Sequence, residues 1–246
     1  MFRRIADHLK NPDWPTVTLE FILVVLGIFL ALQADNWNEQ RKDEADARLF
    51  VERMHSDILL AEMLTDRLRE RRLAVRQSLI EASGVLSDGD DPQELTDAQC
   101  FAIGVSAFFN INISEFPVLA ELIATGRMAI VEDDDLRASL VGLQQIKATL
   151  ELLLLTHLKA AKNLSSGYPH LIAVENYLEP DTDEVRLRYS CDAQEMRANR
   201  AFLNDLALNV DTYDVYVRDG LAPWFEQFDT AHRLVDEVLQ VQHTNE

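Results

Sequence analysis

Two histidines each follow an acidic residue by three positions, a spacing found for ligands in metal-binding helical bundles. The pairs are Glu52–His55 and Asp229–His232. Residues three apart share one flank of a helix, so each pair presents a carboxylate next to an imidazole. A di-metal centre needs two further bridging carboxylates, and the pattern marks none. The alternative interpretation is that these residues form surface ion pairs and that His232 is a hydrogen-bonded core histidine.

The two cysteines, Cys100 and Cys191, are a second pair with chemical potential. They do not form a C-x-x-C motif, so a zinc site or a redox motif built on cysteines is not expected. In an oxidising compartment they could form a disulfide, and their distance along the chain leaves that pairing open.

The sequence carries none of the common signatures of catalysis. It contains no Walker loop, no G-x-S-x-G, no H-E-x-x-H and no dinucleotide fingerprint. The formal charge is −19, which repels phosphates and argues against nucleic acid as a partner. We therefore expect no cofactor, and we favour a non-enzymatic role over an enzymatic one.

An apolar stretch near the N-terminus predicts a membrane anchor. Between Val17 and Ala34 lie 18 residues whose centre, FILVVLGIFLAL, is uncharged. As a helix they span about 27 Å, close to the hydrocarbon thickness of a bilayer. Trp14 and Trp37 bracket the stretch, as expected of side chains in the two headgroup layers. The alternatives are a buried core helix and a signal peptide, although Leu32-Gln33-Ala34 is a poor cleavage site.

The predicted organisation is an interfacial basic segment at 1–13, a transmembrane anchor at 14–37 and an acidic helical domain at 38–246. Lys and Arg are nearly balanced across the anchor. We favour a cytoplasmic N-terminus because a short anchor with a basic start commonly behaves as an uncleaved signal. The helical domain would then be periplasmic.

One face of the anchor carries small and polar residues at alternating steps of four and three, which places them on one side of a helix. These residues are Glu20, Val24, Gly27, Ala31, Ala34 and Asn38. Gly27 and Ala31 form a small-xxx-small pair that lets two helix backbones approach closely. We expect a helix–helix interface here; the alternative is that Glu20 reaches headgroup water and the small residues are incidental.

Helical periodicity predicts the elements of the domain. A helix should continue from the anchor to about residue 82, and Thr96 with Gln99 should form a capping box at the start of another. A short helix should end at Gly126, and a long one should begin at 133–135. The last helical region should start after Asp192 and kink or break at Gly220 and Pro223. Only 179–191 alternates like a strand, with a loop arm as the alternative. The fold class is all-α: one transmembrane helix continuing into an antiparallel bundle of about four long elements, with at most one short strand-like arm.

The anchor resembles the N-terminal signature of an uncharacterised bacterial membrane-protein family, a domain of unknown function. In that family a Glu precedes an apolar run that ends in Gln and is followed by Asn-Trp-Asn-Glu; here these are Glu20, Gln33 and 36–39. Asp35 departs from the pattern. Two further stretches resemble the family. The middle segment is similar to ELIATGRMAIVEDDDLRASL, and the start of the last helix is similar to NRAFLNDLALNV. The resemblance implies a fold and a bacterial inner-membrane location, and no reaction.

These patterns lead to one leading hypothesis and two alternatives for function. The first is a membrane-anchored interaction or scaffold protein that self-associates through its transmembrane helix or binds another membrane protein. The second is a periplasmic ligand-sensing bundle that acts through a partner. The third, the least favoured, is a metal-dependent enzyme.

Overall fold

The computed structural model describes residues 14–88, 93–109, 113, 115–156, 158–180 and 182–241. The interfacial segment predicted at 1–13 lies outside these residues. The chain divides into two compact units, Met1–Phe50 and Val51–Glu246. The domain boundary predicted from the sequence, at residue 38, lies within the first unit.

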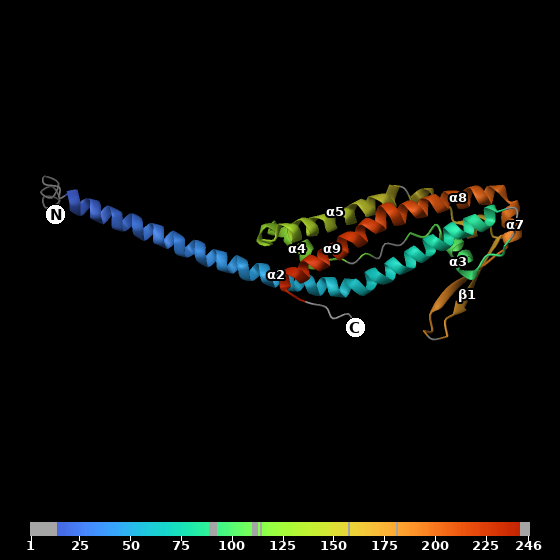
Figure 1. Cartoon of the computed structure of the whole chain (residues 1–246), viewed down its shortest axis with the longest axis horizontal. Helices are drawn as coiled ribbons and strands as arrows, with labels where there is room; N and C mark the ends of the chain where they lie inside the picture. Colours follow the sequence, from blue (N-terminus) through green and yellow to red (C-terminus); the bar gives the residue numbers. More distant parts are fainter. Residues whose placement is uncertain are drawn as a thin grey trace. The chain divides into compact units, whose positions relative to one another are not determined.

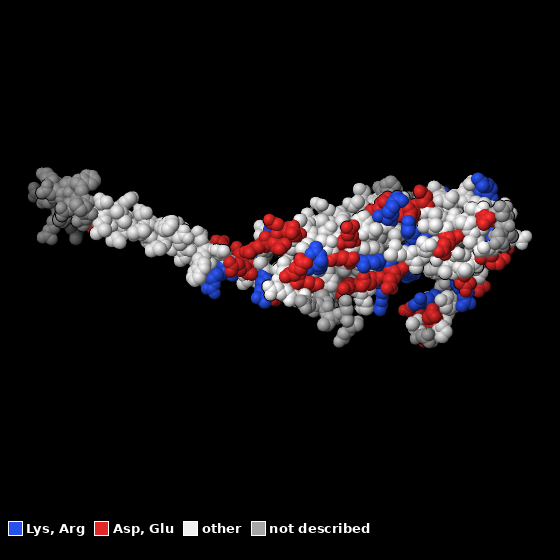
Figure 2. All heavy atoms as spheres, in the orientation of Figure 1, with Lys and Arg blue, Asp and Glu red and all other residues white. Residues whose placement is uncertain are grey.

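A single helix, α2 (Trp14–Ser87, 74 residues), belongs to both units. Its first part exposes every residue from Val17 to Ala34, and an 18-residue window there has a mean hydropathy of 2.3 with no buried residue. This apolar length makes the segment a candidate membrane span. Apart from Glu20, the segment is the white part of α2 in the space-filling view (Figure 2).

From Val51 onward, α2 buries one stripe at alternating steps of three and four residues. The buried stripe comprises Val51, Met54, Ile58, Ala61, Thr65, Arg72, Val75, Leu79, Ala82 and Leu86. The helix ends at Ser87 and not near residue 82. Gly84 does not stop it because a helical glycine costs only about 1 kcal/mol, and burial of Leu86 favours one more turn.

The bundle of the second unit consists of three long helical elements. They are the second part of α2, α5 (Asp134–Thr156) and a continuous helical run formed by α8 (Arg200–Val215), η3 (Tyr216–Leu221) and α9 (Ala222–Leu239). Ion pairs join Arg76 to Asp214 at 2.5 Å and Arg69 to Asp229 at 2.6 Å, so the run is antiparallel to α2. It also packs along α5, as Figure 1 shows. The all-α prediction is confirmed.

Helix α5 also contains an apolar window long enough to cross a membrane, with a mean hydropathy of 1.3. Its Leu136, Leu140, Leu143 and Leu150 are nevertheless buried within the bundle. These four leucines therefore pack in the core, as the sequence pattern predicts, whereas Leu152 and Leu155 near the end of α5 are exposed.

The chain does not break at Gly220 and Pro223. Instead it widens into the π-helical turn η3, and α9 continues with Pro223 in its first turn. A proline removes one amide donor, and the widened turn accommodates this loss without ending the helix. A Cβ on Gly220 would lie 2.7 Å from Leu150 Cδ1, so the glycine also permits close packing against α5. This continuity joins α8 and α9, two of the four long helices of the described residues, into one run.

Shorter elements connect the long ones. They are α3 (Asp97–Val105), α4 (Pro117–Thr125), η1 (Met128–Ile130), η2 (Leu158–Ala160), α6 (Leu164–Gly167) and α7 (Ala193–Ala198). The capping box of Thr96 and Gln99 is formed, and Gly126 ends α4 in the left-handed conformation with φ 68°. Both local predictions are confirmed.

The strand-like arm is a two-stranded hairpin. Strand β1 (Ile172–Leu178) pairs antiparallel with β2 (Val185–Cys191), with Ile172 opposite Cys191 and Leu178 opposite Val185. The alternating stretch predicts β2 correctly. Strand β1 was not predicted because its first residues, Ile172-Ala173-Val174, do not alternate in polarity.

Candidate functional site

Two histidines and an aspartate converge between α2 and α9. His55 Nε2 lies 3.2 Å from Asp236 Oδ1, and His232 Nε2 lies 3.5 Å from Asp236 Oδ2. The imidazole centroids are 6.2 Å apart. One donor atom from each of the three residues lies within 4.8 Å of the others. We refer to His55, His232 and Asp236 as the His–Asp cluster.

The helical periodicity of α9 and its antiparallel packing against α2 assemble this cluster. His232 and Asp236 are four residues apart and therefore project from the same face of α9. His55 lies on α2 next to the buried Met54 and close to Ile58, which fix its part of the helix against the bundle. The three side chains are only 13–18% exposed, so they are partly shielded from solvent and still accessible.

Glu62 extends the cluster along α2. Its Oε1 lies 3.5 Å from His232 Nδ1, on the opposite edge of the ring from Asp236. A carboxylate facing one ring nitrogen favours the tautomer whose other nitrogen has a free lone pair. The arrangement thus combines two imidazoles, one carboxylate and a second carboxylate that orients one of the imidazoles.

The structure brings together only half of the metal candidates predicted from sequence. His55 and His232 meet, but Glu52 is exposed one turn before His55 and is not part of the grouped donors. Asp229 instead bonds Arg69, whose Nη2 donates to its Oδ1 at 2.6 Å. The carboxylates that do face the histidines, Asp236 and Glu62, were missed because the expected motif was Glu-x-x-His. The i, i+4 pair His232–Asp236 was the available signal.

Farther along α2 toward its C-terminal end, Arg72 is buried against a group of aromatic rings. Its guanidinium donates to Tyr213 Oη at 3.5 Å and lies 5.8 Å from the ring of Tyr216. Burial raises the pKa of Tyr216 to about 12, although the positive charge of Arg72 acts in the opposite direction. Burial also raises the pKa of Tyr213. Both phenols therefore remain protonated at neutral pH and serve as structural groups.

Cys100 of α3 and Cys191 of β2 are joined in a disulfide, with their Cα atoms 5.8 Å apart. The pairing that the sequence left open is thus made in the structure. Beside it, the ring of Tyr189 packs onto Gly104, where a Cβ would lie only 2.2 Å from Tyr189 Cδ1. The disulfide and this contact fix the base of the hairpin to α3.

Beyond its fixed base, the hairpin exposes one apolar face. Residues directly opposite each other share a face of a two-stranded sheet, which places Val174, Leu178, Val185 and Leu187 on the same side. Their exposed fractions range from 43% to 70%. We call these four residues the hairpin face; it is a large apolar surface on a projecting element.

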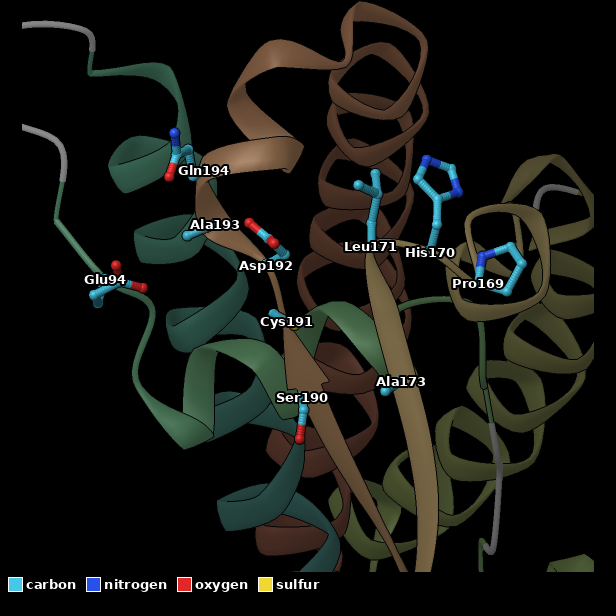
Figure 3. Close-up of a pocket in the computed structure, with 10 residues that line it drawn as sticks. All are labelled: Glu94, Pro169, His170, Leu171, Ala173, Ser190, Cys191, Asp192, Ala193 and Gln194. Atoms are coloured by element: carbon cyan, nitrogen blue, oxygen red, sulfur yellow. The ribbon is translucent and has the colours of Figure 1, made fainter.

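A pocket of about 480 Å³ lies where the hairpin meets α7. Figure 3 shows that its side chains diverge: His170 and Leu171 point away from Ser190, and Glu94 comes from a separate segment. The Asp192 carboxylate accepts a hydrogen bond from Glu195 N at 2.9 Å as the N-cap of α7. The lining thus has structural roles and offers no convergent set of polar groups.

All six predicted interface residues of the anchor lie on α2 and are exposed: Glu20, Val24, Gly27, Ala31, Ala34 and Asn38. A Cβ on Gly27 would meet nothing within 4 Å. The ring of Trp37 is 64% exposed and lies beneath the guanidinium of Arg41, 5.4 Å away. Trp14 is the first residue of α2, and its side chain lies outside the described part.

Comparison with known proteins yields no match to a family model, to a curated protein or to a solved structure.

Proposed function

We propose that this chain is a membrane-anchored interaction protein of the bacterial inner membrane, with its N-terminus in the cytoplasm and its helical domain in the periplasm. The observation that carries the proposal is the change of surface along α2. The same helix exposes an uninterrupted apolar surface from Val17 to Ala34 and buries a narrow stripe from Val51 onward. The first surface needs lipid or another apolar partner, because contact between so much apolar surface and water is unfavourable in free energy.

The disulfide supports an oxidising location for the domain. Disulfides persist in secreted and periplasmic proteins and are rare in the reducing cytosol. The pair Cys100–Cys191 closes a loop over 91 positions and holds the hairpin in place. An uncleaved anchor with a basic start delivers the chain to that side of the membrane.

The anchor is also proposed to mediate self-association. The small and polar face of Glu20, Gly27 and Ala31 allows two copies of α2 to approach closely within the bilayer, where contact and hydrogen bonding drive association. Glu20 would then share a polar environment with its counterpart at the edge of the apolar region. The hairpin face offers a separate surface for a protein partner.

The test is the oligomeric state of the full chain in lipid nanodiscs or mild detergent, measured by light scattering. We expect an oligomer for the natural sequence and a monomer for Gly27→Leu, which places four carbons in the contact. Val25→Leu, on another face of the same helix, is the matched control and should leave the oligomer unchanged. A natural sequence that is monomeric, or an oligomer that Gly27→Leu does not disturb, would refute self-association through this face.

A further inference from the structure

We propose that the His–Asp cluster is a zinc site: Zn²⁺ bound by His55 Nε2, His232 Nε2 and a carboxylate oxygen of Asp236, with Glu62 orienting His232. This inference is independent of the proposed membrane role, since all four residues belong to the second unit. It rests on donor type, donor spacing and the second carboxylate.

The donor types select the class of metal. Two imidazole nitrogens with one carboxylate suit Zn²⁺ and related first-row ions, whereas Mg²⁺ and Ca²⁺ prefer sites made of oxygen. Three protein ligands leave a fourth position for water or for a group from a partner, which is the arrangement of open zinc sites. The partial exposure of the three side chains allows access to that position.

The spacing fits tetrahedral coordination. With metal–ligand bonds of about 2.0–2.1 Å, neighbouring donors of a tetrahedral site lie about 3.3–3.4 Å apart. His55 Nε2 lies 3.2 Å from Asp236 Oδ1, and His232 Nε2 lies 3.5 Å from Oδ2, the other oxygen of the same carboxylate. One donor atom from each of the three residues lies within 4.8 Å of the others, so rotations of the imidazoles and the carboxylate would bring two nitrogens and one oxygen to this spacing.

Glu62 supplies the outer contact that zinc-bound histidines usually make. A hydrogen bond from His232 Nδ1 to Glu62 Oε1 fixes the tautomer and leaves the Nε2 lone pair directed at the metal. The contact spans 3.5 Å in the structure and would shorten on binding.

Zinc at this position would link α2 to α9 across 177 residues of chain, the separation of His55 and His232 in the sequence. Binding to the folded state alone raises its stability. The expected signature is therefore both stoichiometric binding and a rise in the unfolding temperature.

The experiment uses the full chain, purified in detergent without a histidine tag and stripped with a chelator. Zn²⁺ is titrated by calorimetry and by thermal unfolding, with Mg²⁺ and Ca²⁺ as comparison ions. We expect one Zn²⁺ per chain, a higher unfolding temperature with Zn²⁺, and no effect of the other two ions. His55→Ala and His232→Ala should abolish both responses, and Glu62→Ala should weaken affinity by about 10–100-fold.

Two matched controls separate this site from general metal binding by an acidic surface. Glu52→Gln removes the carboxylate one turn from His55, and His170→Ala removes an exposed histidine outside the cluster; both should bind Zn²⁺ like the natural chain. If a histidine variant fails to fold, Asp236→Asn and the visible spectrum of the natural chain with Co²⁺ replace it. The absence of saturable binding, equal binding by His232→Ala, or a weak octahedral Co²⁺ spectrum would overturn the proposal.

Discussion

Removing the disulfide should destabilise the domain by an amount that the length of the closed loop sets. Cys100 and Cys191 are 91 positions apart. In the chain-entropy model, releasing a loop of that length gives the unfolded chain about 4.6 kcal/mol of conformational freedom at 25 °C. Removing a native disulfide typically costs about 2–5 kcal/mol, so we expect the free energy of unfolding to fall by about 3–4 kcal/mol in the double variant Cys100→Ala/Cys191→Ala.

The assay is guanidinium unfolding of the full chain in mild detergent, followed by circular dichroism. The natural chain treated with a thiol reductant should unfold at the same midpoint as the double variant, and each single variant should behave like the double. The natural chain without reductant is the reference. A double variant that loses less than about 0.5 kcal/mol would refute the reasoning, because the cross-link would then not constrain the unfolded chain.

Three further changes test separate contacts of the domain. Gly104→Ala should lower the free energy of unfolding by about 1–3 kcal/mol, because the new Cβ would lie 2.2 Å from the Tyr189 ring. The control Gly84→Ala, whose new Cβ would meet nothing within 4 Å, should be neutral or stabilising by up to about 1 kcal/mol. Equal effects of the two substitutions would contradict this packing. Asn209→Ala should lower the free energy of unfolding, measured by chemical denaturation, by about 2–4 kcal/mol. The reason is that the Asn209 amide forms hydrogen bonds with Ser106 Oγ at 2.7 Å and with the backbone of Lys162 at 2.8 Å. A change below about 1 kcal/mol would show that water replaces those bonds. Burial raises the pKa of Tyr216 to about 12 in the folded chain, from about 10 when unfolded. The resulting stabilisation is complete below pH 10 and is lost as pH rises from 10 to 12, by about 3 kcal/mol in total. Denaturation from pH 9 to 12 should therefore show a shallower fall for Tyr216→Phe than for the natural chain, and parallel curves would contradict the shift.

Local signals in the sequence predicted much of the fold. The capping box at Thr96, the glycine stop at Gly126 and the buried stripe of α2 follow from interactions within a few residues, and all three are present. Of the kink or break predicted at Gly220 and Pro223, the break does not occur, because a π-helical turn keeps the helix continuous. Strand β1 was not predicted because its residues alternate poorly in polarity. Its pairing with β2 stabilises it, and a local pattern does not show that pairing.

The candidate sites were only partly accessible from sequence. His55 and His232 were identified, but their partners depend on how α9 slides along α2, which a local pattern does not encode. The register set by Arg69 with Asp229 and Arg76 with Asp214 brings Asp236 beside the histidines. Likewise, the joining of Cys100 to Cys191 depends on the docking of the hairpin against α3.

We propose above that one helix anchors this chain in the inner membrane and places the disulfide-bonded domain on the periplasmic side. The most direct measurement fuses a reporter after Glu246 and compares two readouts in a Gram-negative host. Alkaline phosphatase is active only where disulfides form. A standard green fluorescent protein is fluorescent in the cytoplasm and stays dark when the general secretory route exports it. We expect an active phosphatase fusion and a dark fluorescent fusion, both in the membrane fraction. A bright fluorescent fusion with an inactive phosphatase, or a fusion recovered in the soluble fraction, would contradict it.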